Sequence, residues 1–301
     1  MKTTTLVSVR RRIRSVRNTQ QITKAMEMVA GARLRKIERK IHITRSYGKE
    51  LNRILLNVLP VLTGDESPLL VSRPQVKRIC FVVMGADRGL CGAFNTNIIR
   101  YAEQFIAEKG KEAKVVACGR KMVRHFQKRP FELLMKVSDL YRSFSLPLTD
   151  AITKKIVESF ENGSVDEVYV IAPRFINVMQ HSMHSFKILP LSLPTISKEL
   201  EAEKVKPSKE TEERVNGGYE LEPDTATLCH HLLKEYISHT LFKWLLETLT
   251  SEAGARMVAM RKASDNAQSV IDTLSLEYNQ ARQRSITAEL LDIVGTVEAL
   301  K

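Results

Sequence analysis

The strongest constraint on this chain is a proline-free run at its C-terminal end, residues 224–301, which contains only two glycines, Gly254 and Gly295. As a single α-helix this run would be about 115 Å long, at 1.5 Å per residue. So long a helix cannot be buried in one small core, and it needs a partner along its length. A buried helix of a bundle and one strand of a coiled coil both fit the pattern.

Apolar and small residues recur at every seventh position of this run, which favours a coiled coil. The alanines would let another helix approach closely, and the polar members make the seam imperfect. One series is Leu246, Ala253, Met260, Ala267, Leu274, Ala281 and Ala288. The companion series is Leu249, Arg256, Ala263, Val270, Glu277, Arg284 and Leu291.

The first 59 residues predict a second long helix, which Pro60 ends. Its seam turns polar at Gln20, Thr23 and Glu27. Because a compact region separates the two helices, we expect them to pair antiparallel. The predicted seam comprises Leu6, Val9, Ile13, Val16, Gln20, Thr23, Glu27, Ala30, Leu34, Ile37, Ile41, Thr44, Gly48, Leu51, Leu55 and Val58.

Between the helices the sequence alternates apolar strand-like runs with helical patterns, which indicates a mainly parallel sheet covered on both faces. The expected fold class is α/β: a Rossmann-like central domain and a long antiparallel coiled coil. The expected domains are helix 1–59, linker 60–75, α/β domain 76–196, charged linker 197–223 and helix 224–301. The expected strands are 77–84, 114–118, 131–137, 167–172 and an edge strand 182–190, and the expected helices between them are 93–109, 119–128 and 150–161.

Net charge is concentrated at the N-terminal end. The chain carries a formal charge of +13, and residues 1–49 hold most of it, with only Glu27 and Glu38 as acids. The partner of this helix is therefore expected to be anionic: nucleic acid, a membrane surface or acidic protein loops. Against nucleic acid, arginines 10, 11, 12, 14 and 17 go around the helix instead of forming one stripe, and a solvated helix face explains them equally well.

Little in the chain predicts chemistry. The glycine-rich loop at residues 85–92 has neither the dinucleotide fingerprint nor the Lys-Ser/Thr of a P-loop, so a tight turn is the favoured interpretation. The histidines and the four cysteines show no metal-ligand spacing, and no nucleophile motif is present. We expect no catalytic residue, no cofactor and no metal. The cysteines fit buried free thiols in a reducing compartment.

Four stretches, in order along the whole chain, form a specific set of motifs. They are residues 20–30 (QQITKAMEMVA), 87–95 (DRGLCGAFN), 251–260 (SEAGARMVAM) and 277–289 (EYNQARQRSITAE). Together with Tyr219 and residues 222–224, they closely resemble the γ subunit of F-type ATP synthases of the bacterial type.

The resemblance implies a non-catalytic rotor shaft that couples ion-driven rotation of a membrane ring to ATP synthesis or hydrolysis on a ring of α and β subunits. It implies a central domain without bound nucleotide. The implied partners are the α, β and ε subunits and the membrane c-ring, with no nucleic acid. It also implies a peripheral position on the cytoplasmic side of the inner membrane, reached through the complex.

Carried over by position, the resemblance implies two sets of contact residues. Contacts with β are implied for Met26, Arg256, Gln283, Thr287 and Glu289, and contacts with the rotor ring for Tyr219 and Glu222. For each of them a solvated helix residue is the alternative interpretation. The apolar end of the last helix, beyond the reach of the first, is expected to lie in the collar of the surrounding ring: Ile286, Leu290, Leu291, Ile293, Val294, Val297 and Leu300.

Residues 119–228 contain no cysteine, so no thiol switch of the plant plastid kind is expected. Two other hypotheses remain open from the sequence. A basic coiled-coil protein that binds nucleic acid or acts as a scaffold would use the same first helix. A nucleotide-using enzyme would bind ATP or NAD as an isolated chain.

Overall fold

The computed structural model describes residues 6–58, 67–143, 146–191 and 224–299. By packing, the chain separates into two compact units. The helical unit comprises Met1–Ala32 with Arg256–Lys301, and the sheet unit comprises Arg33–Ala255. This division cuts both long helices, whereas the domain ranges expected from the sequence end where the helices end; those ranges stay a prediction.

Both expected long helices are present. Helix α1 covers Leu6–Val58, and helix α8 covers Thr225–Ala299. The Asp224 Oδ1 atom accepts the backbone N–H of Thr227 at 2.8 Å, so this residue caps the start of α8 as expected. Among the described residues, no helix combines the length and the apolar character needed to cross a membrane.

The sheet unit is built on one five-stranded sheet in the order β3-β2-β1-β4-β5. The first four strands of that order are parallel, and β5 pairs antiparallel with β4 at the edge. This confirms the mainly parallel sheet and the edge strand. The strands are β1 (Arg78–Met84), β2 (Glu112–Cys118), β3 (Glu132–Val137), β4 (Glu167–Asn177) and β5 (Gln180–Leu189).

Strand β4 runs five residues past the predicted end at residue 172. The extension continues as a hairpin with β5, in which Phe175 is opposite His181. The sequence of the extension, P-R-F-I-N, lacks the continuous apolar run used to predict strands, because its side chains are largely exposed.

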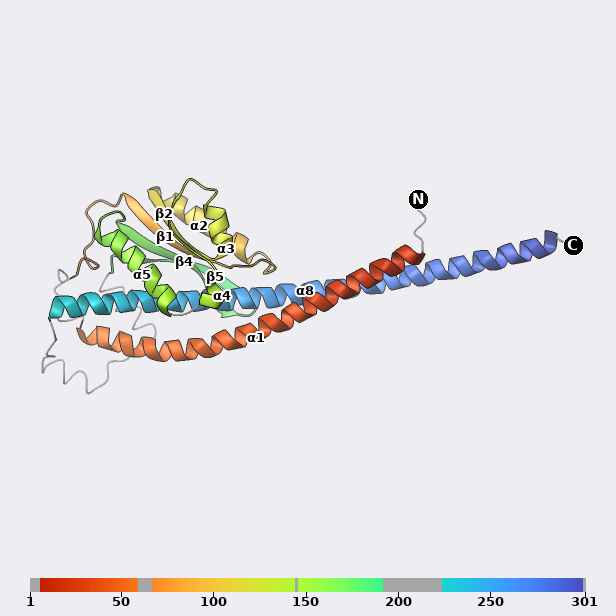
Figure 1. Cartoon of the computed structure of the whole chain (residues 1–301), viewed down its shortest axis with the longest axis horizontal. Helices are drawn as coiled ribbons and strands as arrows, with labels where there is room; N and C mark the ends of the chain where they lie inside the picture. Colours follow the sequence, from red (N-terminus) through yellow and green to blue (C-terminus); the bar gives the residue numbers. More distant parts are fainter. Residues whose placement is uncertain (1–5, 59–66, 144–145, 192–223, 300–301) are drawn as a thin grey trace. The chain divides into compact units, whose positions relative to one another are not determined.

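Helices cover both faces of the sheet, as Figure 1 shows for the sheet unit. They are α2 (Phe94–Lys109), α3 (Arg120–Phe126), a short α4 (Leu140–Ser143) that was not predicted, and α5 (Leu146–Glu161). Alternate residues of a strand point to opposite faces. In β1, Phe81 packs in the core with α2 and α3, whereas Val82 packs in the core that includes α5 and the adjoining parts of α1 and α8.

Two helical glycines mark close approaches to α8 inside the sheet unit. A Cβ on Gly48 would overlap the ring of His239, so α1 comes close to α8 at this point. A Cβ on Gly254 would lie 3.2 Å from the carbonyl oxygen of Val178, which is at the tip of the β4–β5 hairpin. A helix interior disfavours glycine, so these close contacts explain why glycine stands at both positions.

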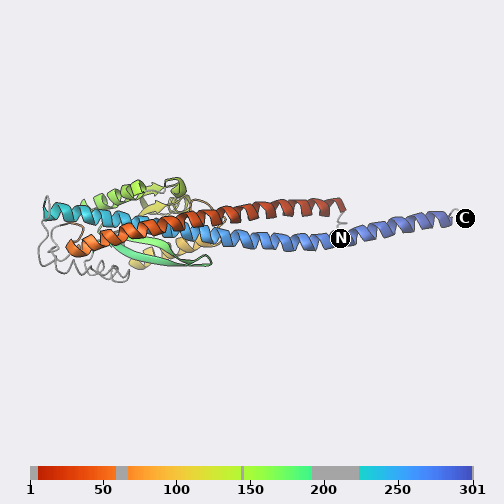
Figure 2. The ribbon, with the colours of Figure 1, turned by 90° about the horizontal axis from the view of Figure 1, so that it is seen from below.

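In the helical unit the first part of α1 lies beside α8 in an antiparallel pair, which both Figure 1 and Figure 2 show. Two interhelical hydrogen bonds define its register. Arg261 Nε donates to Glu27 Oε1 at 2.9 Å, and Gln20 Nε2 donates to Gln268 Oε1 at 2.8 Å. Both bonds fit one antiparallel register, because Gln20 comes seven residues before Glu27 on α1 and Gln268 comes seven residues after Arg261 on α8. Leu6, where α1 begins, is then level with Arg282.

The seam predicted for α1 is confirmed: every one of its positions is buried or half-buried. For α8 one of the two predicted series is wrong beyond Ala263. Val270 is 44% exposed, and Glu277, Arg284 and Leu291 are exposed. The buried positions after Met260 are instead Ser264, Ala267, Ile271 and Leu274, whereas Ala263, Ser275, Tyr278, Ala281 and Ser285 are half-buried.

The physical reason is a local change of helical phase. After Met260 the next buried position follows after four residues, at Ser264, where an uninterrupted heptad would step three. Such an added step is a stutter, which locally unwinds a coiled coil. A strict seven-residue count cannot detect it, because Ala263 is as small as a true seam residue.

Candidate functional site

The C-terminal part of α8 exposes large apolar side chains. In the register set by Glu27 and Arg261, residues 282–299 extend past the point where α1 begins. Water-exposed apolar surface that is continuous along an element is typical of an interaction site. The exposed fractions are 45% for Ile286, 57% for Leu290, 66% for Leu291, 61% for Ile293 and 60% for Val294. We call these five residues the apolar tip; the side chains of Val297 and Leu300, also predicted for it, lie outside the described residues.

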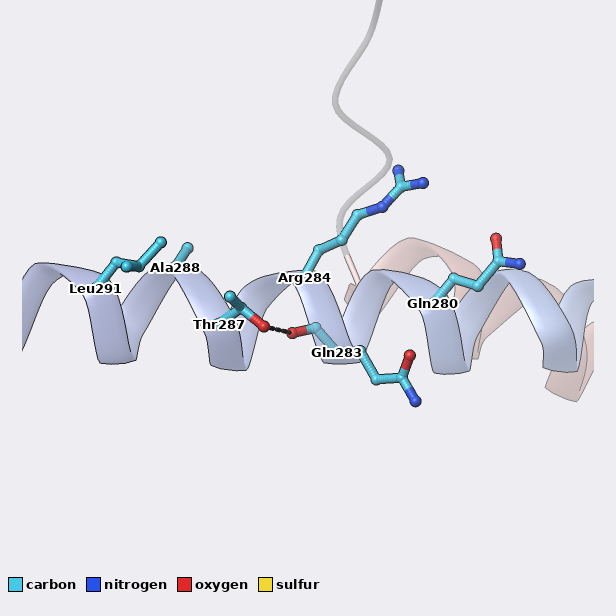
Figure 3. Close-up of a pocket in the computed structure, with 6 residues that line it drawn as sticks. All are labelled: Gln280, Gln283, Arg284, Thr287, Ala288 and Leu291. Atoms are coloured by element: carbon cyan, nitrogen blue, oxygen red, sulfur yellow. Dashed lines mark hydrogen bonds between the residues drawn. The ribbon is translucent and has the colours of Figure 1, made fainter.

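Polar residues accompany the tip, and Figure 3 shows them along one side of the helix. A shallow surface concavity is lined by Gln280, Gln283, Arg284, Thr287, Ala288 and Leu291. Thr287 Oγ1 donates to the carbonyl oxygen of Gln283 at 2.9 Å, which fixes the hydroxyl against the helix. The structure therefore brings two of the predicted contact residues, Gln283 and Thr287, onto one face.

Glu289 is also exposed, but it belongs to another side of α8. Two residues of an α-helix correspond to a rotation of about 200°, so Glu289 and Thr287 point in nearly opposite directions. Ser285 Oγ donates to Glu289 Oε1 at 3.4 Å, one turn back along the helix. The tip thus presents different chemistry on different sides.

The predicted contact residues Met26 and Arg256 are at another level of the helical unit. Met26 is half-buried, and Arg256 is only 6% exposed. In the observed register Met26 is level with residue 262, about 30 Å from Gln283 along the axis. The structure therefore divides the predicted β contacts between two levels and does not form one site from them. Tyr219 and Glu222 lie outside the described residues.

Beside Met26 the structure has a polar cluster that the sequence indicated only in part. Glu27 is 7% exposed and accepts hydrogen bonds from Arg261 Nε at 2.9 Å and from Lys24 Nζ at 3.1 Å. The bond from Arg261, with that from Lys24, lowers the pKa of Glu27 below its ordinary value. A carboxylate this well paired stays ionised inside the seam.

Sequence reasoning missed the partners of this cluster, Arg261 and Gln268. It had identified the polar break at Gln20, Thr23 and Glu27, but it assigned no partner. The signal was present: Gln20 and Glu27 are one heptad apart on α1, as Arg261 and Gln268 are on α8. Searching for the antiparallel register that joins matching polar residues would have found both pairs.

The glycine-rich loop at residues 85–92 is held by its own carboxylate. Asp87 Oδ1 accepts the backbone N–H groups of Arg120 and Asp139, each at 3.0 Å. Arg120 Nη2 also donates to Asp139 Oδ1 at 2.8 Å. Both donors lie outside the loop, at the start of α3 and just before α4, so Asp87 ties the loop to those two segments. The tight turn expected from the sequence is therefore held not by local bonds of Asp87 but by its bonds to residues 33 and 52 positions further along the chain.

The histidines and cysteines are distributed through the sheet unit. His181 packs on Phe94, and His184 packs on Trp244, so they point to opposite faces of the sheet. The four cysteines are buried and form no disulfide with one another. Among the residues that the structure describes, no group of three or more His, Cys, Asp or Glu side chains is placed to hold a metal ion.

Comparison with known proteins gives consistent results over nearly the full length. A family profile described as ATP synthase matches residues 5–300. The ATP synthase gamma chain of Syntrophus aciditrophicus is 38% identical over 298 residues, with 98% of each chain covered. That of Desulfitobacterium hafniense is 36% identical, covering 97% of this chain and 98% of the relative. None of these similarities favours the nucleic-acid-binding or scaffold hypothesis.

Solved structures share the fold. A chain in the rotational state 3 structure of the OSCP, F1 and c-ring of the Euglena gracilis mitochondrial ATP synthase has a TM-score of 0.65 at 18% identity, with 98% of this chain and 94% of that chain covered. A chain from the central stalk and c-ring of the Tetrahymena thermophila mitochondrial enzyme has a TM-score of 0.59 at 21% identity, covering 81% and 99%. The matched family profile and the 36–38% identical relatives establish that this chain belongs to the ATP synthase gamma chain family.

Proposed function

We propose that this chain is the central rotor shaft of an F-type ATP synthase. It couples ion-driven rotation of a membrane rotor ring to ATP synthesis or hydrolysis on a ring of α and β subunits. The observation that carries this proposal is the apolar tip, which α8 exposes beyond the start of α1. A shaft inside a ring needs an apolar end that turns against an apolar collar, and hydrophobic contact is non-directional enough to permit turning.

Contacts with β follow from the two levels of the helical unit. At the tip, Gln283 and Thr287 present hydrogen-bonding groups on one side and Glu289 presents a charge on another. Because the sides differ, each β subunit of a surrounding ring meets a different surface as the shaft turns. At the other level, Met26 and Arg256 flank the Glu27–Arg261 pair. Because Arg256 is buried, it supports the contact surface from within the helical unit.

The N-terminal part of α1 supplies the electrostatic side of the contact. Arg10, Arg11, Arg12, Arg14 and Arg17 are all exposed. Their distribution around the helix suits attraction to acidic loops of α or β at every rotational angle, since no single direction is favoured. The remaining partners in this proposal are ε and the membrane c-ring, with Tyr219 and Glu222 facing the ring.

In this proposal the chain is not catalytic by itself. Asp87 places a carboxylate in the loop at residues 85–92, bonded to the backbone N–H groups of Arg120 and Asp139, and its negative charge disfavours a phosphate there; this supports a central domain that works without a nucleotide. The chain would be held peripherally at the cytoplasmic side of the inner membrane, through the c-ring. Binding of ATP or NAD to the isolated chain at micromolar concentration would contradict this part.

The central test is assembly. Affinity-tagged chain, purified from its host, is expected to bring α, β and ε with it in a complex that hydrolyses ATP and pumps ions. If it purified instead with nucleic acid or without α and β, the shaft proposal would be abandoned.

Coupling is tested by Met26→Lys. The added cation increases attraction between the rotor and acidic groups of β. We expect ATP hydrolysis to continue while fewer ions are pumped per ATP. Val71→Lys, in the sheet unit where Val71 is 48% exposed, is the matched control and is expected to leave that ratio unchanged. An unchanged ratio in Met26→Lys would remove this residue from the proposal.

The rotor-ring contact is tested by cysteine cross-linking. Tyr219→Cys and Glu222→Cys are each expected to form a cross-link with a cysteine in the polar loop of the c subunit. Lys154→Cys, on the exposed face of α5, serves as the control and is expected to form none. Equal cross-linking from all three positions would show that the two residues have no specific place at the ring.

A further inference from the structure

A groove in the sheet unit has no role in the shaft mechanism described above. It has a volume of about 640 Å³ and lies where α1, the β4–β5 hairpin and α8 meet. It is lined by residues of α1, by residues of β4 and β5, and by five residues of α8: His239, Lys243, Trp244, Leu246 and Glu247. All of these residues belong to the sheet unit.

The charge of the groove is positive. Lys49 of α1, Arg174 of β4 and Lys243 of α8 line it, and all three are exposed. Neither Lys49 nor Arg174 forms an ion pair within the described part of the chain. The one lining carboxylate, Glu247, accepts the backbone N–H of Phe175 at 2.8 Å, so it is already engaged in holding the hairpin. This arrangement leaves a net attraction for negative charge.

An aromatic surface lies among these cations. Trp244 is half-buried and stacks on Phe186, with ring centroids 4.8 Å apart and planes inclined by 28°. The ring of His184 also lies near Trp244, with the two ring centroids 6.1 Å apart. Burial, together with the charge of Arg174, lowers the pKa of His184, so this histidine is neutral at neutral pH. An indole with an apolar face and a polar N–H is typical of a contact for a peptide side chain.

The strand beside the groove supports the same kind of ligand. β5 is the last strand of the sheet and pairs only with β4 among the described strands. Ser185 and Phe186 of this strand line the groove. An edge strand offers backbone N–H and C=O groups to an incoming extended segment. A free phosphate would use the cations but neither the aromatic surface nor the edge.

We propose that this groove binds an acidic peptide segment of a partner protein, which places a carboxylate between Lys49 and Arg174 and an apolar side chain on Trp244. The inference rests on the proposed function in one respect, that the partner is a component of the same assembly. It adds the location and the chemistry of the contact.

The test uses the full-length chain in the purified assembly. A photo-reactive p-benzoylphenylalanine replaces Lys49, and a second protein carries it at the exposed residue Lys111 as the control. After illumination, mass spectrometry is expected to identify an acidic segment of another subunit joined at position 49 and not at position 111. A cross-link only to residues 192–223 of the same chain, only to a second copy, only to lipid or nucleic acid, or to nothing, would overturn the proposal.

Charge variants in the same cross-linking protein sharpen the result. Arg174→Glu is expected to lower the cross-link yield about tenfold, because it places like charges together. Arg174→Lys is expected to preserve most of the yield, and Lys111→Glu all of it. An undiminished yield in Arg174→Glu overturns the role of charge. Recovery of α and β with every variant separates these outcomes from failure of the shaft proposal, which would remove the assembly itself.

Discussion

The sheet unit and the helical unit differ in how they bury their apolar side chains. In the sheet unit, helices cover both faces of the sheet, and residues such as Ile98 and Phe126 are completely buried. In the helical unit, two helices share one narrow seam whose middle is polar, and the apolar tip faces water. The sheet unit is therefore complete within its own chain, whereas the helical unit is complete only in an assembly.

The polar pairs of the helical unit explain how it keeps a defined geometry with so little core. Alanine and serine dominate the middle of the α8 seam and fill little volume. A seam of small residues would tolerate a shift by one heptad at little cost. Such a shift would separate Glu27 from Arg261 and Gln20 from Gln268, and would leave the carboxylate of Glu27 in the seam without its interhelical partner. The pairs thus specify register where packing does not.

The comparison predicts its largest effect at Phe126, whose ring is fully buried against Phe131 in the core with α2 and α3. Phe126→Ala is expected to lower the free energy of unfolding by about 3–5 kcal/mol, because it removes a large apolar side chain and leaves a cavity. Urea unfolding of the isolated chain, followed by circular dichroism, measures it. A loss below about 1 kcal/mol would show that the core of the sheet unit is loosely packed, and would contradict the difference between the two units.

A smaller effect is expected in the helical unit from Glu27→Ala. This change removes two charge-assisted hydrogen bonds and is expected to destabilise the pairing of α1 with α8 by about 1–2 kcal/mol. Disulfide formation between cysteines at Ala30 and Val258, which are level in the observed register, reports the pairing. Glu38→Ala, also on α1, is the control. Pairing in a shifted register in Glu27→Ala would confirm that Glu27 specifies register; an unchanged register and yield would contradict it.

The two units also differ in how much of their structure could be predicted from the sequence. The strands of the sheet unit could be predicted because runs such as residues 79–84 are continuously apolar, and the helices because of their periodicity. The seam of α1 was also predictable in full, since its large apolar residues leave one choice of face. The seam of α8 was not, because Ala263 and Ser264 are both small and only contact with a partner helix decides which one is buried.

The candidate site shows the same limit. The apolar tip could be predicted from composition and length alone. The separation of Met26 from Gln283 into two levels could not, because it depends on the register that two hydrogen bonds establish. The groove beside Trp244 could not be predicted either, since residues 49, 174 and 243 come together only through the fold.

The pH dependence of the helical unit provides a finer test. The lowered pKa of Glu27 means that its charged form stabilises the fold. That contribution is fully present above its ordinary pKa of 4.5 and is lost as pH falls through the lowered pKa of the folded state. The difference in free energy of unfolding between wild type and Glu27→Gln is therefore expected to be constant from pH 6 to 8, and to shrink below about pH 4.5. A difference that grew on acidification would have the wrong sign for this pair.

A substitution in the apolar tip should have almost no effect on the stability of the isolated chain. Leu291→Ser is expected to change the free energy of unfolding by no more than about 0.5 kcal/mol, because Leu291 is 66% exposed. In the assembled complex the same change is expected to reduce ATP synthesis, because the collar contact loses an apolar group. Val270→Ser, at an exposed position level with α1, is the control for the assembly. Destabilisation of the isolated chain would mean that the tip has a partner in its own chain.

The smallest expected effect concerns the thiols, all of which are in the sheet unit. Burial raises the pKa of Cys80 and of Cys118 to about 12, so both are protonated thiols at neutral pH and react slowly. Ellman's reagent should therefore modify neither in the native chain over minutes at pH 8, although it should modify both in urea. ATP hydrolysis by the assembly should be the same with and without a dithiol reductant. Clear activation by the reductant would reveal a thiol switch. Rapid labelling of Cys80 in the native chain would show that the core of the sheet unit opens to the reagent, contrary to the complete burial described above.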